Sequence, residues 1–137
     1  MGLNVAIVGS RDINDLELLE NIWEQLKLPY KDICIVSGGA VGVDTNGEEF
    51  ANKYDIPTHI FKPDWDRYGK RAGFKRNEDI IKNCDMCIAI WDGKSPGTKH
   101  SIDLCKAYFK RLYVWNNSPG QKKLFTYKYE NTQLELF

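Results

Sequence analysis

Apolar residues occur along this chain in short unbroken runs that alternate with stretches of helically spaced apolar positions. The first run, Asn4 to Gly9, is apolar on both faces and ends in glycine, which is typical of a buried strand in a parallel sheet. Similar runs predict strands over 32–36, 57–61, 86–91 and 111–115. Apolar spacings of three and four predict helices over 16–26, 46–54, 76–83 and 98–109, with Asn14 or Asp15 capping the first.

Strands that alternate with helices through short links indicate an open α/β sheet with right-handed crossovers. We therefore predict a doubly wound, mainly parallel sheet of order 3-2-1-4-5 with helices on both faces. In this order the first and fourth strands are neighbours, and the winding reverses between them. A ligand crevice is then expected at the carboxyl ends of these two strands.

One glycine-rich turn, over residues 35–44, follows the second predicted strand with the sequence Ile-Val-Ser-Gly-Gly-Ala-Val-Gly-Val-Asp. Glycine permits positive φ and close approach of backbone N–H groups, and a helix N-terminus adds unpaired donors, so an anionic ligand is expected. The alternative is that Gly38-Gly39 only connects strand and helix tightly. The turn lacks Gly-x-Gly-x-x-Gly and the Lys-Ser/Thr of a P-loop, so neither an ordinary dinucleotide dehydrogenase nor an NTPase is indicated.

Two further turns are expected to meet the first one. Gly9-Ser10-Arg11 ends the first strand, and Asp-Gly-Lys-Ser-Pro-Gly-Thr at 92–98 follows the fourth. Because the carboxyl ends of neighbouring parallel strands share one edge of the sheet, all three turns should line one crevice. Their convergence predicts a phosphate-binding site.

The remaining segments have weaker patterns. Lys62 to Gly73 mixes aromatic, basic and turn-forming residues without periodicity, so we predict a long ordered surface loop there. Lys122 to Glu130 alternates as a strand does. We expect one domain over residues 1–130, followed by a tail or peptide motif at 131–137.

Composition removes several function classes. Lys and Arg number 19 and Asp and Glu number 19, so no overall charge points to nucleic acid or membrane. The first strand has no basic leader or spanning apolar stretch before it, from which we expect a cytoplasmic protein. The cysteines lack the paired spacing of a zinc site, and the lone Cys84-x-x-Cys87 gives little support for metal or redox use, so no metal or cofactor is expected.

Four motifs together resemble a known family. They are Val8-Gly9-Ser10-Arg11, Ser37-Gly38-Gly39-Ala40-x-Gly42-x-Asp44, Trp65-x-x-x-Gly69-Lys70-x-Ala72-Gly73-x-x-Arg76-Asn77, and Trp91-Asp92-Gly93-x-Ser95-x-Gly97-Thr98. From about Val5 to Trp115 the chain resembles the SLOG superfamily, specifically its small single-domain YspA-like branch. The resemblance implies a Rossmann-like fold that binds nucleotides or nucleotide-derived ligands. Relatives include Lonely Guy phosphoribohydrolases, DNA-processing A proteins that bind single-stranded DNA, and proteins that bind NAD-derived signals.

The chemistry of these residues suggests their roles. Backbone donors of Gly38, Gly39 and Gly97 would hold phosphate, and two arginines would add charge-assisted bonds. Asn77 could read a base or ribose edge; Asp44 either accepts from ribose hydroxyls or only caps a helix; Trp65 either stacks on a base or only pins its loop. The expected ligand-binding residues are Gly9, Ser10, Arg11, Ser37, Gly38, Gly39, Gly42, Asp44, Trp65, Lys70, Arg76, Asn77, Asp92, Gly93, Gly97 and Thr98.

The leading hypothesis is a sensor or sequestering protein for a nucleotide-type ligand, such as an ADP-ribose derivative or a nucleoside phosphate. The enzymatic alternative is a phosphoribohydrolase or N-glycosidase acting on a nucleoside monophosphate, which needs a carboxylate close to the sugar. In Lonely Guy enzymes an essential Glu follows the second glycine turn, whereas here Gly97-Thr98 is followed by Lys-His-Ser-Ile-Asp. The catalytic candidates are Asp44, Asp92 and Asp103, and none has the family position.

The tail suggests a third function. Its sequence Gln-Leu-Glu-Leu-Phe at 133–137 resembles the bacterial sliding-clamp-binding peptide and departs from it in the third residue. Leu136 and Phe137 would fill an apolar pocket, with Leu134 nearby and the Gln133 amide bonded at the rim. The alternative is that this tail packs on the protein's own sheet. A nucleic-acid partner and a homo-oligomer are both compatible with the sequence.

Overall fold

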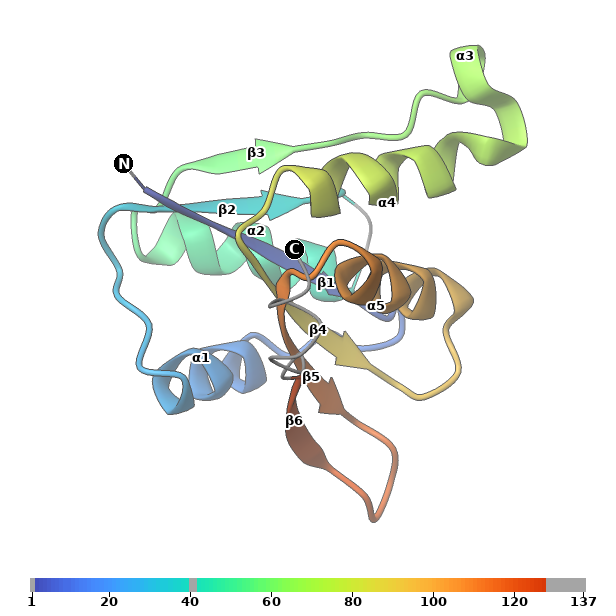
Figure 1. Cartoon of the computed structure of the whole chain (residues 1–137). Coiled ribbons are helices and arrows are strands. Elements are labelled where there is room, and N and C mark those ends of the chain that lie inside the picture. The colour runs from blue at the N-terminus through green and yellow to red at the C-terminus, as the bar shows by residue number, and fades with distance from the viewer. Residues whose placement is uncertain (1, 40–41, 128–137) are drawn as a thin grey trace, which may run out of the picture.

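The computed structural model describes residues 2–39 and 42–127, and a six-stranded sheet forms its centre (Figure 1). The strands are β1 (Leu3–Gly9), β2 (Ile33–Ser37), β3 (Thr58–Ile60), β4 (Met86–Trp91), β5 (Arg111–Asn116) and β6 (Lys123–Tyr127). Their order is β3-β2-β1-β4-β5-β6; the first five are parallel and β6 is antiparallel to β5. The predicted Rossmann-like order is confirmed, and the alternating segment near the C-terminus adds an edge strand.

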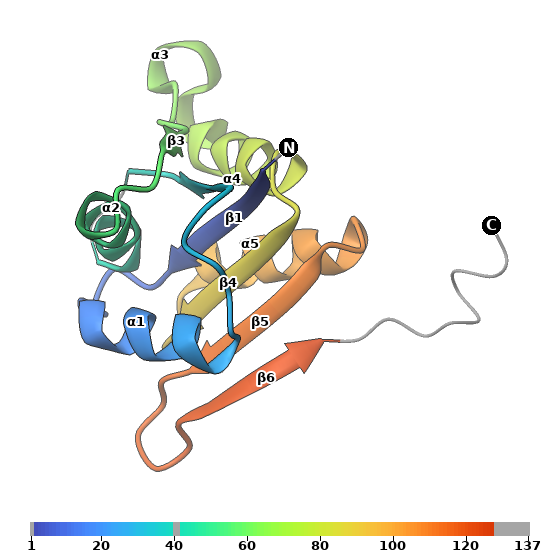
Figure 2. The same cartoon turned by 90° about the vertical axis from the view of Figure 1, so that its left-hand side faces the viewer.

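Helices cover both faces of this sheet (Figure 2). They are α1 (Leu16–Gln25), α2 (Val43–Lys53), α4 (Ala72–Lys82) and α5 (Pro96–Ala107). Val5 and Ile7 of β1 pack against α1 and α2, whereas Ala6 and Val8 pack against α4 and α5. Successive side chains of a strand point to opposite faces, so β1 is apolar throughout because both of its faces are buried. None of the described helices is long and apolar enough to cross a membrane.

The starts of three helices depend on features that apolar spacing does not reveal. Gly42, at φ 81°, precedes α2 and lets the chain enter the helix at Val43 rather than Asn46. Pro96 takes the first turn of α5, where its missing N–H costs no helical hydrogen bond. Of the two candidate caps of α1, Asp15 fills the role, because its carboxylate accepts from the Leu18 N–H at 3.0 Å.

The prediction of a long loop over 62–73 is wrong for most of that segment. It forms a short helix α3 (Trp65–Tyr68), a 3-10 turn η1 (Gly69–Arg71) and the start of α4 at Ala72, ahead of the predicted Arg76. Asp64 caps α3 by accepting the Arg67 N–H at 3.1 Å. The segment has no fully buried side chain before Ala72, so it carries no apolar periodicity, and α3 stands away from the sheet (Figures 1 and 2).

The Cys84-x-x-Cys87 pair lies in the core between β4 and the helices α4 and α5. Burial raises the pKa of the Cys84 thiol to about 12, and a hydrogen bond with Cys105 together with burial raises the pKa of Cys87. Thiols with raised pKa values stay protonated and are poor nucleophiles and ligands. Within the described ranges, no group of three or more His, Cys, Asp or Glu side chains could hold a metal ion.

Candidate functional site

A cavity of about 430 Å³ opens at the carboxyl end of β1, beside the turn that follows β4. This is the place where the winding of the sheet reverses. Its size falls in the usual range of small-molecule sites, roughly 300–1,000 Å³. The lining comes from the end of β1 and the turn after it, from α2, α3 and α4, and from α5 with its N-cap residue. The lining residues are Val8, Gly9, Arg11, Asp44, Trp65, Arg76, Asn77, Ile80, Ser95, Pro96, Gly97, Thr98 and Ser101.

Ser10 holds together the three turns around this cavity. Its N–H donates to the Ile90 carbonyl at 3.1 Å, and its carbonyl accepts from the Val43 N–H at 3.4 Å. Its hydroxyl accepts from the Asp92 N–H at 3.1 Å. Ser10 is only 1% exposed and does not line the cavity. Its hydrogen bonds therefore hold β1, the start of α2 and the turn after β4 together behind the cavity wall.

Two glycines allow these backbones to approach each other. A Cβ on Gly9 would lie 2.5 Å from the Ile90 carbonyl oxygen and 2.6 Å from Val43. A Cβ on Gly42 would lie 2.5 Å from the Arg11 carbonyl oxygen, and the positive φ of Gly42 already disfavours any other residue. The structure therefore explains both glycines by packing between turns.

Arg76 enters the cavity from α4 with its side chain fixed by two hydrogen bonds. Its Nη1 donates to the Gly38 carbonyl at 2.8 Å, and its Nε donates to Asn77 Oδ1 at 3.0 Å. A Cβ on Gly38 would lie 2.6 Å from Arg76 Nη1. Gly38 thus makes room for the guanidinium, and the predicted cradle of Gly38 and Gly39 is not part of the described cavity lining.

Asn77 links Arg76 to the neighbouring helix α5. Because its Oδ1 accepts from Arg76, its Nδ2 faces His100 Nδ1, at 3.2 Å. An amide nitrogen only donates, so this arrangement requires His100 Nδ1 to accept and its proton to sit on Nε2. Asn77 is 9% exposed, and this chain of contacts fixes both the amide and the guanidinium beside it.

The N-terminus of α5 forms another wall of the cavity. The first N–H groups of a helix have no partner within it, and Ser95, the N-cap residue, makes no side-chain cap bond. Asp92 shapes the preceding turn, accepting the N–H groups of Lys94 and Ser95 at 2.8 Å each. Burial acts to raise the pKa of Asp92, but these bonds and the contact with Ser10 outweigh it, so the pKa lies below its ordinary value. Asp92 is therefore a carboxylate engaged in folding the turn.

The three candidate catalytic carboxylates occupy different environments. Asp44, in the first turn of α2, is 7% exposed and lines the cavity. Asp92 is engaged by the backbone and does not line it. Asp103 lies on the exposed face of α5, where it pairs with Lys99 at 2.9 Å. Asp44 alone of the three could reach a bound molecule directly.

The charges of the lining favour an anion. Arg11 and Arg76 carry two positive charges against the one negative charge of Asp44. The positive end of the α5 dipole adds to this balance. Helix N-termini combined with arginines are common binding sites for phosphate groups.

A sequence model of the YspA, cpYpsA-related SLOG family matches residues 3–68. The resemblance to the SLOG family is confirmed. The match contains β1, the glycine turn after β2 and Trp65, and it ends before Arg76 and the second glycine turn. No protein with a curated description matches the sequence.

Two solved structures extend the likeness over most of this chain. One is DNA processing protein A from Helicobacter pylori, described for its single-stranded DNA binding mode, with a TM-score of 0.67 and 24% identity over 88% of this chain and 68% of that one. The other is DNA processing protein A from Streptococcus pneumoniae, with a TM-score of 0.69 and 19% identity over 88% of this chain and 52% of that one. At these identities the likeness shows the fold, and the chain spans about half the length of the second protein.

The predicted ligand residues divide into two groups. The first lines the cavity and comprises Gly9, Arg11, Asp44, Trp65, Arg76, Asn77, Gly97 and Thr98. The second lies outside the described lining and comprises Ser10, Ser37, Gly38, Gly39, Gly42, Lys70, Asp92 and Gly93. Ser37 is fully buried with its hydroxyl 3.4 Å from the Asp44 carbonyl, and Lys70 is exposed on η1. The tail residues Gln133, Leu134, Leu136 and Phe137 lie outside the described residues.

Sequence reasoning missed five lining residues: Val8, Ile80, Ser95, Pro96 and Ser101. Helical spacing could have found two of them, because Ile80 lies one turn after Arg76 and Ser101 one turn after Thr98. Pro96 carried the usual signal of a helix start. Val8 stands in the first motif, but its apolar character gave no signal of a cavity, since a buried strand residue that borders a cavity has the same character as one that borders the core.

Proposed function

We propose that this protein binds a nucleotide or a nucleotide-derived ligand in the cavity at the end of β1, and acts as a sensor or sequestering protein. The single observation that carries the proposal is the meeting of Arg11, Arg76 and the α5 N-terminus on one cavity. The SLOG match and the nucleic-acid-related names of the two similar structures support a nucleotide-related module.

The phosphate end of the ligand would lie against α5 and the arginines. Backbone N–H groups of Gly97 and Thr98 would donate to it, and each arginine would add charge-assisted bonds. Arg76 already donates hydrogen bonds to Gly38 and Asn77, so its guanidinium would be oriented before the phosphate binds. Preorientation of this kind lowers the entropic cost of binding.

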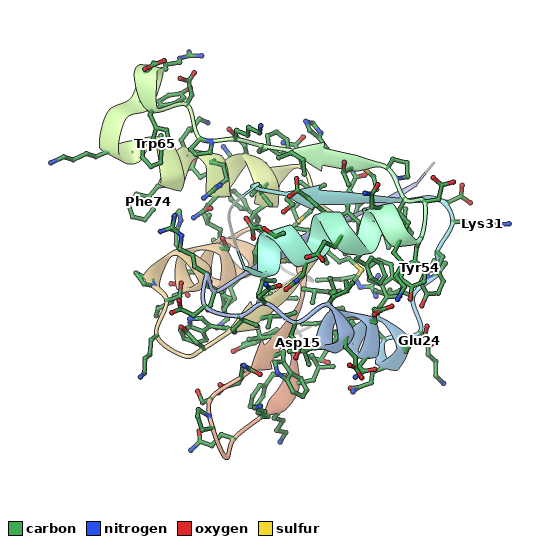
Figure 3. The ribbon with its side chains drawn as sticks, turned by 180° about the vertical axis from the view of Figure 1, so that it is seen from behind. Asp15, Glu24, Lys31, Tyr54, Trp65 and Phe74 are labelled. Carbon is green, nitrogen blue, oxygen red and sulfur yellow. The ribbon has the colours of Figure 1, made fainter. Side chains whose placement is uncertain are left out.

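The other end of the ligand would face Asp44 and Trp65. The buried Asp44 carboxylate favours hydroxyl donors, such as those of a ribose. Because it is negatively charged, it would also disfavour a second anionic group at this end of the ligand. Trp65 is 60% exposed at the rim, where Figure 3 shows it on α3, and its ring would stack on a base.

Mass spectrometry of small molecules released from the purified, denatured protein tests this proposal, followed by thermal melting with ADP-ribose and with AMP. We expect an intact nucleotide in the released fraction and a higher melting temperature with at least one of the two compounds. A variant with Arg11→Ala and Arg76→Ala should lose both signals. Arg111→Ala is the matched control, since Arg111 is an exposed arginine on β5 outside the cavity. No released nucleotide and no shift in melting temperature would contradict the proposal.

The position of Asp44 also favours a second candidate function, hydrolysis of the glycosidic bond of a nucleoside monophosphate. A carboxylate beside the sugar could stabilise the oxocarbenium-like transition state or activate a water molecule. Incubation with AMP should then release free adenine, and Asp44→Asn should abolish the release while nucleotide binding persists. Intact AMP after prolonged incubation would restrict the protein to binding.

The tail sequence Gln-Leu-Glu-Leu-Phe at 133–137 favours a third candidate, recruitment to a bacterial sliding clamp. A pull-down with purified clamp should recover the intact protein but not a variant with Leu136→Ala and Phe137→Ala. That variant should keep its melting temperature and its nucleotide response. A marked fall in melting temperature without clamp binding by the intact protein would assign these residues to packing instead.

A further inference from the structure

His100, in the second turn of α5, is held beside the cavity by the neighbouring helix α4, although it does not line the cavity itself. One ring nitrogen, Nδ1, lies 3.2 Å from Asn77 Nδ2. The ring of Phe74, a residue labelled in Figure 3, meets the imidazole in a T-shaped contact, with ring centres 4.8 Å apart and planes at 88°. Both contacts come from α4, so this helix determines where the imidazole lies.

A chain of hydrogen bonds leads from this imidazole to Arg76 in the cavity. The Asn77 amide accepts from Arg76 Nε through Oδ1, at 3.0 Å, and its Nδ2 faces His100. A guanidinium has no acceptor atom, so only the amide oxygen can satisfy Arg76 Nε. The amide nitrogen must then donate to His100, which requires a neutral imidazole with no proton on Nδ1.

A proton on Nδ1 is incompatible with this chain of bonds. An imidazolium has donors only, so its Nδ1–H would face the NH2 group of Asn77. If the amide turns over, its oxygen accepts from His100, but its NH2 group then faces Arg76 Nε. Either way two donors oppose each other beside Asn77, which is only 9% exposed, and a buried donor without an acceptor is costly. With the amide turned, Arg76 keeps only its bond to the Gly38 carbonyl.

The acidic and basic side chains around this imidazole on α4 and α5 are paired with one another. On α5, Lys99 and Asp103 form an ion pair at 2.9 Å. On α4, the carboxylate of Glu78 lies 4.0 Å from the Lys75 ammonium and 3.8 Å from the Lys82 ammonium. Among these groups, an imidazole is the one whose charge ordinarily changes between pH 5 and 8. The other titratable groups of this region are Arg11, Asp44 and Arg76 in the cavity and the Cys87 thiol on β4.

We propose that His100 is a positioning residue for Arg76, and that its neutral form is required for tight binding of an anion in the cavity. The proposal rests on the anion site assigned to the cavity above. Neutral His100 orients the guanidinium through Asn77, and protonated His100 releases it. The affinity for an anion should therefore fall as the pH is lowered. A positive charge added near an anion would by itself raise the affinity, so the expected change is opposite in sign to the simple electrostatic effect.

NMR of the 15N-labelled protein tests the chain of hydrogen bonds without any ligand. The sequence contains two histidines, His59 and His100, so the spectrum of His59→Gln assigns the ring signals. At a pH of about 8 we expect the proton of the His100 ring on Nε2. As the ring titrates, the signals of the Asn77 side-chain amide and of Arg76 Nε–H should move with it. A titration of His100 that leaves both signals in place would overturn the proposal.

Isothermal titration calorimetry with ADP-ribose tests the effect on binding. Each phosphate of ADP-ribose is esterified and keeps one negative charge, whereas the monoester phosphate of AMP titrates at about pH 6 and would obscure the result. Between pH values of about 8 and about 5.5, the Kd of the unchanged protein should rise about tenfold, as for the loss of one hydrogen bond of a charged group. Inorganic sulfate, whose charge is also constant over this range, is the second probe.

Two substitutions of His100 separate its hydrogen bonding from its charge. His100→Gln keeps an acceptor for Asn77 Nδ2 but does not titrate, so it should bind ADP-ribose well at both pH values. His100→Lys has donors only and should bind weakly at both pH values, even though it adds a positive charge. His59→Gln is the matched control, because His59 is an exposed histidine on β3 outside the described cavity lining. It should keep the full pH dependence.

The possible failures are distinguishable. No binding of ADP-ribose or sulfate at a pH of about 8 would overturn the anion site together with the role of His100. Binding that is equal at the two pH values, or that falls equally in the unchanged protein and in His100→Gln, would overturn the role of His100 alone. Tight binding by His100→Lys would do the same. If His100→Gln folds poorly, His100→Lys and the NMR titration of the unchanged protein still decide the question.

Discussion

Trp23 on α1 is fully buried, whereas Trp65 on α3 leaves 60% of its surface exposed. Around Trp23, the rings of Tyr30, Phe50 and Tyr54 form a cluster with centres 4.7–6.2 Å apart. Their polar atoms all have partners: the Trp23 Nε1 donates to the Pro29 carbonyl at 3.2 Å, and the two tyrosine hydroxyls bond to Glu24 and Glu20. We call this α1–α2 layer the closed side (Figure 3).

The α3–α5 layer, which we call the open side, uses the same residue types differently. Trp65 and Phe74 are exposed there, and the arginines have donors beyond those that the fold uses. Regions whose groups are all paired contribute stability, while regions that leave aromatics and cations exposed sacrifice stability for binding. The comparison teaches that local surroundings, more than residue type, decide which aromatic and charged groups of this molecule are buried and paired and which stay exposed.

The largest expected effect breaks the closed side. Trp23→Ala should lower the free energy of unfolding by about 3–5 kcal/mol, because it empties a fully buried site. Trp65→Ala, the same change on the open side, should alter that free energy by less than about 0.5 kcal/mol. Urea denaturation of both variants measures the difference, and similar losses would erase the distinction between the sides.

On the open side, the largest effect should concern ligand affinity. Arg76→Ala should weaken nucleotide binding by about 1.5–3 kcal/mol, the range for a hydrogen bond with a charged group. Gly38→Ala should weaken binding in the same direction, because its Cβ would lie 2.6 Å from Arg76 Nη1 and displace the guanidinium. Isothermal titration calorimetry measures the nucleotide affinity of both variants.

Gly73→Ala is the matched control for Gly38→Ala, since a Cβ there meets nothing within 4 Å. It should leave the affinity unchanged. Arg76→Lys should recover only part of the affinity, because an ammonium cannot reproduce both bonds of the guanidinium. If the two Arg76 variants, Gly38→Ala and Gly73→Ala all bind the nucleotide as tightly as the unchanged protein does, Arg76 is not part of the site.

A smaller effect is expected in acid, from Asp92 beside the cavity. Its folded pKa is below the ordinary value, so the carboxylate stabilises the fold above the unfolded pKa of about 3.9, and this contribution is lost as pH falls through the folded pKa. Asp92→Asn should lower the melting temperature at neutral pH and should make the melting temperature fall less steeply below pH 4. Parallel melting curves for the two proteins across the acid range would contradict this role.

The smallest effect should appear in alkali, from the closed side. The hydrogen bond to Glu24, together with burial, raises the pKa of Tyr30 to about 12. Stability linked to this group is present below the unfolded pKa of about 10 and is lost as pH rises from there to about 12. Tyr30→Phe should flatten the fall in melting temperature over this range. Glu24→Gln should reduce this fall in melting temperature as well. If the fall is the same in both variants as in the unchanged protein, the hydrogen bond between Tyr30 and Glu24 does not affect stability.

The sequence predicted the parallel strands because burial on both faces leaves a direct record in apolar runs such as Val5 to Val8. Their order followed from the usual winding of strands that alternate with helices. It missed α3 and η1 because a projecting arm held by one Asp64 cap has no apolar side to reveal it. It also could not show that Gly38 lies against the Arg76 guanidinium, since a glycine that admits an arginine side chain and a glycine that admits phosphate look alike in sequence. The distinction requires Arg76, which lies far along the chain and reaches Gly38 only in the folded protein.

The antiparallel direction of β6 has a practical consequence for handling this protein. Tyr127, the last described residue of β6, pairs with Leu112 near the start of β5, so the described part of β6 ends at the end of the sheet opposite the cavity. The β6 edge is also the edge farthest from β3, which precedes α3 in the chain. A fluorophore or surface tether attached at Tyr127 would therefore leave both the cavity and α3 accessible to soluble probes.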